Sequence, residues 1–298
     1  MGKADEFGAP VEIDTGARVV RITNPDKVMF PSVGPAKEQR SKLDLVRYYV
    51  AVADALMPTV RDRPVLLERY PNGVREKSFF QKRIPDSAPD WLVTTTVETI
   101  NGTPSRALVI ADLAHVLWAV NMGVLGLHVW PFRATAPGDH DEMRIDLDPS
   151  PGVTFDMVRE AAAHVRDHLA ELDIIGFAKT TGSKGIHVYV RVEPGWDSFA
   201  VRGAVVALGR ELARRHPELI TDKWWKEERG TRVFVDFNQN APHKNMFGAW
   251  GARPRVGAQV STPFSWDELD TIDPEAMTID SVPRRLAERG DPWALIDD

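Results

Sequence analysis

Apolar residues recur at helical spacing in several segments of the chain. Spacings of three and four residues place such side chains on one face of a helix, so each segment predicts an amphipathic helix packed against a core. A polar residue able to cap a helix stands at the start of the first three: Ser41, Asp112 and Thr154. The segments cover residues 41–57, 112–127, 154–172 and 201–216.

Other segments alternate between apolar and polar residues, the pattern of a half-buried strand. In residues 143–148, apolar side chains alternate with Arg144, Asp146 and Asp148, so both aspartates share the polar face of one strand. Similar patterns predict strands at residues 127–130, 174–180, 186–192 and 232–238. The order of elements predicts an α+β fold with mixed or antiparallel central sheets flanked by helices. We expect residues 1–20 to be an N-terminal extension and residues 21–298 to form a single catalytic domain of two interlocked lobes.

Composition narrows the classes of protein to consider. The 298 residues can bury a large core, and 43% apolar with 27% charged residues is typical of soluble globular proteins. The chain has no cysteine, which excludes thiol catalysis and disulfides. Residues 1–18 lack the apolar core of a signal peptide, and polar residues interrupt the apolar stretch 107–130, so we expect neither secretion nor a membrane span. The net charge of −6 does not exclude nucleic acid, because local patches bind phosphates.

Asp146 and Asp148 are the first candidates for chemistry. Residues two apart on a strand lie about 6.5–7 Å apart at the backbone, so their carboxylates can share divalent cations. Asp236 is the best third ligand, because it interrupts the apolar strand 233–237, where an unpaired charge would be costly. Further acidic residues near the pair would attract cations if they converged with it: Asp139, Asp141 and Glu142. A bare Asp-x-Asp, however, caps a helix or faces solvent roughly two times in three.

A second candidate is the turn between the strands at 174–180 and 186–192. Gly182 and Gly185 let backbone amides surround an anion, while hydroxyl groups and Lys184 add donors and charge, which suits a triphosphate. His187 then begins the next strand on its polar face. The alternative, at about even odds, is an ordinary hairpin turn with a surface lysine, because the spacing is not that of a P-loop.

Basic and aromatic residues form a third group. Phe79 and Phe80 precede Lys82 and Arg83 and could stack on bases, although core packing explains such pairs more often. Other members of the group lie near the N-terminus or on either side of Asp236: Asn24, Lys27, Lys42, Arg229 and Arg253.

Taken in order, these segments resemble the polymerase domain of bacterial DNA ligase D, a branch of the archaeo-eukaryotic primase superfamily. The resemblance covers roughly residues 20–290, and the ordered set is more specific than any single motif. Its motifs are Asn24-Pro25-Asp26-Lys27, Arg69-Tyr70-Pro71-Asn72-Gly73, Phe79-Phe80, Asp146-Leu147-Asp148-Pro149, Gly182-Ser183-Lys184-Gly185-Ile186-His187 and Val233-Phe234-Val235-Asp236-Phe237-Asn238-Gln239-Asn240.

The resemblance implies roles for individual residues. The catalytic aspartates, which hold two divalent metal ions, manganese or magnesium, would be Asp146, Asp148 and Asp236. The incoming nucleotide would be surrounded by His128, Thr181, Ser183, Lys184, His187, Arg229 and Arg253. The 5′-phosphate of DNA would be held by Asn24, Lys27 and Lys42, and the template would stack on Phe79 and Phe80. Because the segment 33–40 is longer than usual, Lys37 is an alternative to Lys42.

The activity that the resemblance implies is template-dependent DNA or RNA polymerisation, a nucleotidyltransferase reaction with a preference for ribonucleotides. Expected partners are gapped or broken DNA with a 5′-phosphate, NTPs or dNTPs, and an end-binding protein, in the cytoplasm near the nucleoid. The chain has no Lys-x-Asp-Gly ligase motif, so we expect a separate DNA ligase to seal the product.

Several alternatives remain open on sequence alone. Gap filling in excision repair, remodelling of ends in non-homologous end joining, and primer synthesis all fit a polymerase. Clustered aspartates also serve metal-dependent phosphoesterases. A catalytically inactive module that binds DNA ends would need none of the three aspartates.

Overall fold

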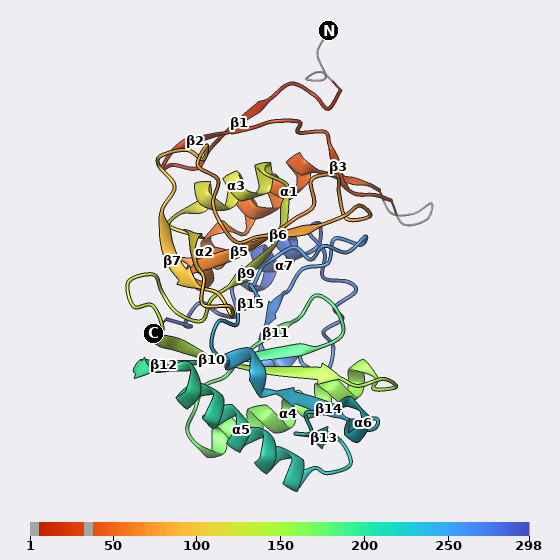
Figure 1. Cartoon of the computed structure of the whole chain (residues 1–298). Coiled ribbons are helices and arrows are strands. Elements are labelled where there is room, and N and C mark those ends of the chain that lie inside the picture. The colour runs from red at the N-terminus through yellow and green to blue at the C-terminus, as the bar shows by residue number, and fades with distance from the viewer. Residues whose placement is uncertain (1–5, 33–37, 298) are drawn as a thin grey trace.

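The computed structural model describes residues 6–32 and 38–297, which fold into two lobes, each built on a six-stranded sheet (Figure 1). This architecture confirms the predicted α+β class. In the described part of the chain, none of the helices combines the length and apolar character needed to cross a bilayer.

The upper lobe in Figure 1 carries helices and two short hairpins around a sheet in the order β15-β9-β5-β8-β7, with β6 paired to β5. The strands of the sheet are β5 (Pro64–Arg69), β6 (Phe79–Gln81), β7 (Thr94–Glu98), β8 (Pro104–Val109), β9 (Val124–Val129) and β15 (Met246–Phe247). The helices are α1 (Lys42–Ala51), α2 (Ala53–Val60) and α3 (Leu113–Asn121). The hairpins pair β1 (Val11–Asp14) with β2 (Val19–Ile22), and β3 (Val28–Phe30) with β4 (Arg40–Ser41).

The lower lobe has a sheet in the order β13-β14-β10-β12-β11-β16, with α4 and α5 packed on the face away from the upper lobe (Figure 1). The strands are β10 (His140–Pro149), β11 (Phe177–Thr180), β12 (Ile186–Trp196), β13 (Ile220–Thr221), β14 (Val233–Asp236) and β16 (Pro263–Phe264). Its helices are α4 (Phe155–Glu171), α5 (Ser198–Arg215) and α6 (Lys226–Arg229), with 3-10 turns η1 (Phe237–Asn240) and η2 (Trp266–Glu268). The last helix, α7 (Val282–Arg289), lies behind the upper sheet, and its Val282 belongs to the core of the upper lobe (Figure 1).

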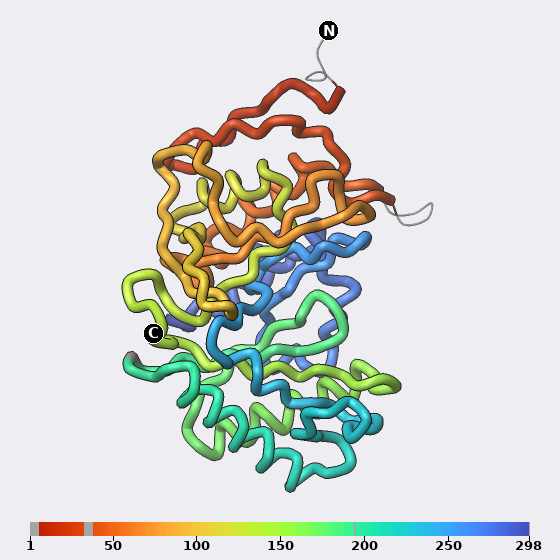
Figure 2. Tube along the Cα trace, viewed as in Figure 1, coloured from red at the N-terminus to blue at the C-terminus, as the bar shows by residue number. Residues whose placement is uncertain are grey.

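The chain crosses between the lobes more than once (Figure 2). After β14 in the lower lobe, the chain returns to the upper sheet, where β15 pairs with β9. The last residues then lie at the junction, where the Ile296 carbonyl accepts a hydrogen bond from Arg191 at 3.0 Å. Each lobe therefore contributes strands or anchoring contacts to the other.

Local signals in the sequence located the starts of three of the four predicted helices. The fourth, predicted at residues 201–216, begins earlier, at Ser198, and the helix predicted at residues 112–127 ends at Asn121. Ser41 accepts a hydrogen bond from the Asp44 amide, Asp112 from the His115 amide and Thr154 from the Met157 amide, so all three predicted caps are confirmed. The single helix predicted over residues 41–57 is wrong, because α1 ends at Ala51 and α2 begins at Ala53. The stripe of buried apolar residues continues across this break. Its spacing indicates which side chains are buried, not where the backbone hydrogen bonds of a helix end.

Two predicted strands were too long. The strand expected at residues 174–180 begins only at Phe177. The strand expected at residues 232–238 ends at Asp236, because the Asp236 carboxylate accepts a hydrogen bond from the Asn238 amide at 2.8 Å and starts η1. Asp236 thus stands at the end of an apolar strand, with its side chain held by the turn that follows.

Candidate functional site

The three aspartates converge because their strands are neighbours in the lower sheet. Strand β10 lies between β14 and β12, and Asp146 is directly opposite Asp236 in the register of β10 and β14. Asp148 lies two residues farther along β10, on the same face. On the other side of β10, Asp146 is opposite His187, whose Nε2 lies 3.3 Å from an Asp146 carboxylate oxygen.

Electrostatics show that the three carboxylates are close enough to repel one another. Burial raises the pKa of Asp146 to about 6, although Lys179 and Arg253 oppose the rise. Burial and the charge of Asp146 raise the pKa of Asp148 and of Asp236. A cation placed among these groups would relieve both the burial cost and the mutual repulsion.

The donor set fits divalent metal ions of the Mg²⁺ and Mn²⁺ class, which prefer carboxylate oxygens. In residues 6–32 and 38–297, no three acidic or histidine side chains already stand at ligand spacing, so a bound ion would have to pull the carboxylates closer to one another. Asp236 is the most constrained of the three, because Gln239 also donates to its second carboxylate oxygen at 3.0 Å.

The turn at residues 181–185 lies against an arginine-bearing loop. Arg253 donates to the Thr181 carbonyl at 2.6 Å, and Arg255 donates to the Ser183 hydroxyl at 2.5 Å. Gly182 has φ +69°, and a Cβ there would lie 2.6 Å from the Cγ of Arg253, so a larger residue would displace the arginine. The Thr181 hydroxyl accepts hydrogen bonds from the amides of the turn and so holds its shape.

The other predicted nucleotide-binding residues surround the aspartates from both lobes. Lys184 is exposed at the tip of the turn. Arg229 stacks on the Phe234 ring at 3.6 Å, and its Nη1 lies 3.7 Å from an Asp148 oxygen. Arg253 spans the junction, because its guanidinium lies over the Phe247 ring of the upper sheet at 4.1 Å and also donates to Thr181 of the lower lobe. Its charge opposes the rise that burial causes in the pKa of Asp146.

His128 faces this junction from the upper sheet, and its ring is held on three sides. Its Nε2 lies 3.1 Å from a Glu68 carboxylate oxygen, and the other oxygen of Glu68 accepts a hydrogen bond from the Tyr70 hydroxyl at 2.7 Å. The rings of Phe80 and Phe247 meet the His128 ring edge-on, each at 5.4 Å between centroids. Glu68 was not among the predicted residues, although it is a charge that directly follows the apolar run 64–67 of β5, a signal similar to the one that identified Asp236.

Lys179 is a second residue that sequence reasoning missed. It is fully buried and stands opposite His187 in the register of β11 and β12, which completes a polar row running from Lys179 through His187 and Asp146 to Asp236. Its ammonium group donates to the Ser261 hydroxyl at 2.6 Å and to the Phe247 carbonyl at 3.1 Å. Burial lowers its pKa well below the ordinary value. The polar faces of four strands therefore meet in one row, which periodicity alone could not reveal.

The predicted template residues are exposed. Phe79 is 48% exposed and Phe80 is 52% exposed, so neither belongs to the core. They alternate along β6: Phe80 packs against His128, whereas Phe79 lies beside the guanidinium of Arg69 at 5.2 Å. Phe80 therefore shares the face of His128, and Phe79 does not.

The predicted 5′-phosphate residues lie together at the start of the upper lobe. The backbone amide of Lys27 bonds to the Asn24 carbonyl, and that of Lys42 bonds to the Lys27 carbonyl. Lys42 is only 5% exposed, and its ammonium group donates to the carbonyls of Thr23 and Asn121. Burial and the charge of Lys27 lower the pKa of Lys42 to about 8. The alternative residue, Lys37, lies outside the described residues.

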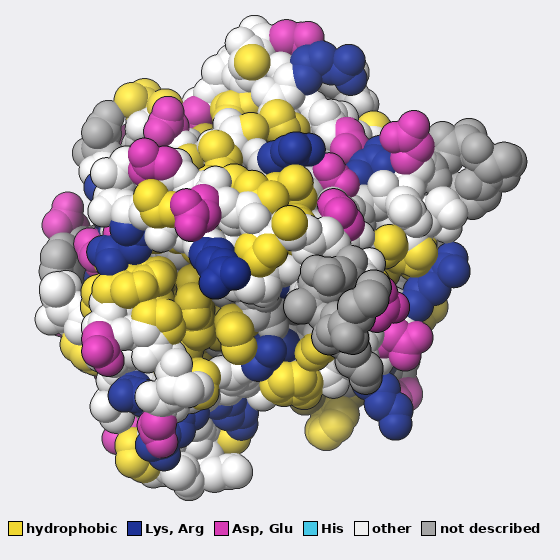
Figure 3. All heavy atoms as spheres, turned by 90° about the horizontal axis from the view of Figure 1, so that it is seen from above, with side chains coloured by type: hydrophobic (Ala, Val, Ile, Leu, Met, Phe, Trp, Pro, Cys, Tyr) yellow, Lys and Arg dark blue, Asp and Glu magenta, His cyan; other side chains and the backbone are white. Residues whose placement is uncertain are grey.

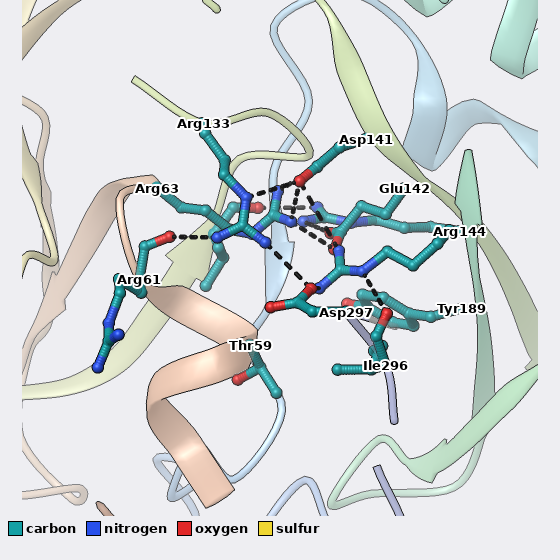
Figure 4. Close-up of polar contacts among 12 residues, drawn as sticks. Thr59, Arg61, Arg63, Arg133, Asp141, Glu142, Arg144, Tyr189, Ile296 and Asp297 are labelled. Carbon is teal, nitrogen blue, oxygen red and sulfur yellow. Dashed lines mark hydrogen bonds and ion pairs between the residues drawn. The ribbon is translucent and has the colours of Figure 1, made fainter. Parts of the chain in front are cut away.

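The neighbouring acidic residues do not join the aspartate site. Asp141 and Glu142 are bound by arginines from both lobes (Figure 4). Arg63, fully buried, lies 2.7 Å from Asp141 and 3.2 Å from Glu142, and Arg144 and Arg191 each donate to Glu142 at 2.7 Å. Against the effect of burial, the three arginines lower the pKa of Glu142 to about 2. The expectation that Asp141 and Glu142 would add to a cation site is therefore wrong, because arginines already neutralise both.

Charges of both signs also share the outer surface. Seen from above the upper lobe, Lys and Arg side chains are interspersed with Asp, Glu and apolar side chains (Figure 3). Neither sign of charge therefore dominates this face. A local cluster of cations, such as that around the 181–185 turn, can still attract phosphate.

Comparison with known proteins identifies the family. A family model described as the LigD primase-polymerase domain matches residues 41–293. The multifunctional non-homologous end joining protein LigD of Mycolicibacterium smegmatis is 34% identical over 283 residues, covering 93% of this chain and 36% of its own length. The bifunctional LigD of Bacillus subtilis is 30% identical over 276 residues, covering 92% of this chain and 43% of its own length. The chain thus spans well under half the length of these curated relatives.

A solved structure resembles the fold closely. The polymerase domain from Mycobacterium tuberculosis Ligase D in complex with DNA superposes with a TM-score of 0.85 at 32% identity, covering 93% of this chain and 98% of that one. The sequence match and the fold agree over nearly the whole chain. This chain belongs to the LigD primase-polymerase domain family.

Proposed function

We propose that this chain is a template-dependent polymerase that extends a DNA 3′ end across short gaps or breaks during DNA repair, with non-homologous end joining as its main pathway. The observation that carries the proposal is the convergence of Asp146, Asp148 and Asp236 beside the 181–185 turn and Arg253. The pathway is supported by the names of the LigD relatives. The family match and the likeness to a polymerase domain in complex with DNA support the activity.

The residues divide into two groups by what they would contact. Asp146, Asp148 and Asp236 would hold two divalent ions, which when bound would activate the 3′-hydroxyl and hold the triphosphate. Lys184, Arg229 and Arg253 would neutralise the charge of the leaving pyrophosphate. Asp236 and Asp148 would serve the attacking side, because Asp236 is oriented by η1 and Asp148 is the exposed member of the set, at 55%.

Ribonucleotide preference, manganese as the favoured ion, and recognition of a 5′-phosphate by Asn24, Lys27 and Lys42 are parts of the same proposal. The last is supported by the proximity of the three residues at one end of the upper lobe. Sealing of the product would fall to a DNA ligase activity outside these residues.

Extension of a primer on a gapped duplex tests the function. We expect extension with manganese, faster with ribonucleotides, and stronger when the downstream strand carries a 5′-phosphate. Asp146→Ala and Asp148→Ala should abolish it, whereas Asp90→Ala, at an exposed loop position, should not. Absence of extension by the unaltered protein, or normal extension by both active-site variants, would refute the proposal.

A further inference from the structure

Two neighbouring tryptophans lie exposed where α6 begins. Trp224 is 46% exposed and Trp225 is 65% exposed. Trp224 has partners on one side, because its ring centroid lies 6.4 Å from that of Phe234 and 6.0 Å from that of Phe237. Trp225 takes part in none of the aromatic pairs found among the described residues. The more exposed ring is therefore the one available for a partner.

The backbone that carries Trp225 is held firmly in place. Arg229 donates to the carbonyls of Lys223 at 3.1 Å and Trp224 at 2.8 Å. Arg232 donates to the carbonyls of Glu228 and Arg229, both at 2.8 Å. Arg229 and Arg232 thus fix the backbone on both sides of Trp225. A ring carried by a fixed backbone loses less entropy on binding.

The same segment borders the aspartate site. Figure 1 places α6 beside β14, the strand that ends in Asp236. The Nη1 of Arg229 lies 3.7 Å from an Asp148 carboxylate oxygen. Lys226 is the first residue of α6, the same short helix that carries Arg229 as its last residue. Trp225, Lys226 and Arg229 therefore lie on one short segment whose last residue reaches the exposed Asp148.

We propose that Trp225, assisted by Lys226, stacks on an unpaired base near the 3′ end of the DNA strand that is extended. Exposed aromatic rings next to cations are the usual components of single-strand binding sites. The strand follows from the proposed function, on which this inference rests, because Asp148 and Asp236 serve the attacking 3′-hydroxyl there. A protein partner is less well matched, since a stable protein interface buries more than about 1,000 Å², and the exposed large apolar side chains of this segment are two tryptophans.

Binding of a labelled single-stranded oligonucleotide, measured by fluorescence anisotropy without nucleotide, tests the stacking. Trp225→Ala should weaken binding about 5- to 150-fold, the range expected for loss of one base–aromatic stack, and Trp225→Phe should retain most of the affinity. Phe199→Ala is the matched control: Phe199 is 71% exposed on α5, which starts at the far end of β12 from α6 in Figure 1, and this variant should bind normally. Equal affinity of Trp225→Ala and the unaltered protein would overturn the proposal.

The salt dependence of the same measurement separates stacking from charge. Trp225→Ala should leave the slope of log affinity against log salt unchanged, whereas Lys226→Ala should reduce it by about 0.7. A changed slope in Trp225→Ala would mean that the substitution has disturbed the cations, which counts against stacking.

A 2-aminopurine base identifies the strand. Its fluorescence should be quenched when it occupies a 3′ overhang, and the quenching should be lost in Trp225→Ala. Quenching only in a 5′ overhang would refute the assignment to the extended strand, and a Trp225→Ala variant that loses self-association instead of DNA binding would refute a base as the partner. These readouts need no polymerase activity, so they can succeed or fail independently of the proposed function.

Discussion

Replacement of Asp146 by asparagine should stabilise the metal-free protein while removing its activity. The Asp146 side chain is 15% exposed, and burial raises its pKa from 3.8 to about 6. At 1.36 kcal/mol for each pH unit, this difference corresponds to about 3 kcal/mol of destabilisation once Asp146 is ionised. Because part of the side chain contacts water, we expect Asp146→Asn to gain about 1–3 kcal/mol at pH 7.

The pH dependence gives this prediction its sign. A carboxyl group with a raised pKa binds its proton more tightly in the folded protein than in the unfolded chain. The free energy of unfolding should therefore fall as pH rises from about 4 to about 6, the interval between the two pKa values. The asparagine of Asp146→Asn does not titrate in this range. The free energies of unfolding of the two proteins should therefore be similar near pH 3.5 and should differ increasingly up to pH 7.

Urea denaturation in EDTA at a series of pH values measures the effect, with Asp90→Asn as a control at an exposed position. Saturating manganese should reverse the order, because an ion that binds only the folded state stabilises it by about 2.7 kcal/mol at one hundred times its dissociation constant. A metal-free Asp146→Asn variant that is less stable at pH 7, or a difference that does not grow with pH, would refute the reasoning.

Three further predictions follow from the contacts around the site. Glu68→Ala should raise the KM for nucleotide more than it lowers kcat, because His128 loses its Nε2 partner. In a His128→Ala background, Glu68→Ala should have no further effect, which a double-mutant cycle of initial rates would show. Arg63→Ala should cost about 3–5 kcal/mol in urea denaturation, since it leaves Glu142 buried without one of its arginines; a cost below about 1 kcal/mol would contradict this. The preference for a 5′-phosphate should weaken as pH rises through about 8, where Lys42 loses its proton. The measurement is the ratio of gap-filling rates with phosphorylated and unphosphorylated downstream strands, and a ratio that does not change with pH would show that Lys42 has no part in it.

Features of the chain that depend on local spacing could be predicted from the sequence. The helix caps Ser41, Asp112 and Thr154 act on amides three residues away, and the alternation around Asp146 is a property of one strand. The convergence of Asp146 with Asp236 was predicted because a charge in an apolar strand needs a partner, and the register of β10 and β14 supplies it. At these positions the residue type and the apolar pattern around it indicate the same structure, which is why the sequence was sufficient.

Contacts between distant segments could not be predicted in this way. The pairing of Glu68 with His128 joins residues 60 positions apart and depends on the register of β5 and β9. Asp141 and Glu142 are neutralised by arginines of both lobes, and no spacing in the sequence indicates that these arginines lie beside them. The exposure of Trp225 is equally invisible in sequence, because a tryptophan is usually placed in the core.

The most direct test of the central claim compares primer lengthening with the phosphate species released on gapped DNA in manganese. Nucleotidyl transfer predicts one pyrophosphate for each nucleotide added, and loss of both signals in Asp146→Asn, Asp148→Asn and Asp236→Asn. Release of inorganic phosphate without primer lengthening would indicate a phosphoesterase and would contradict the account.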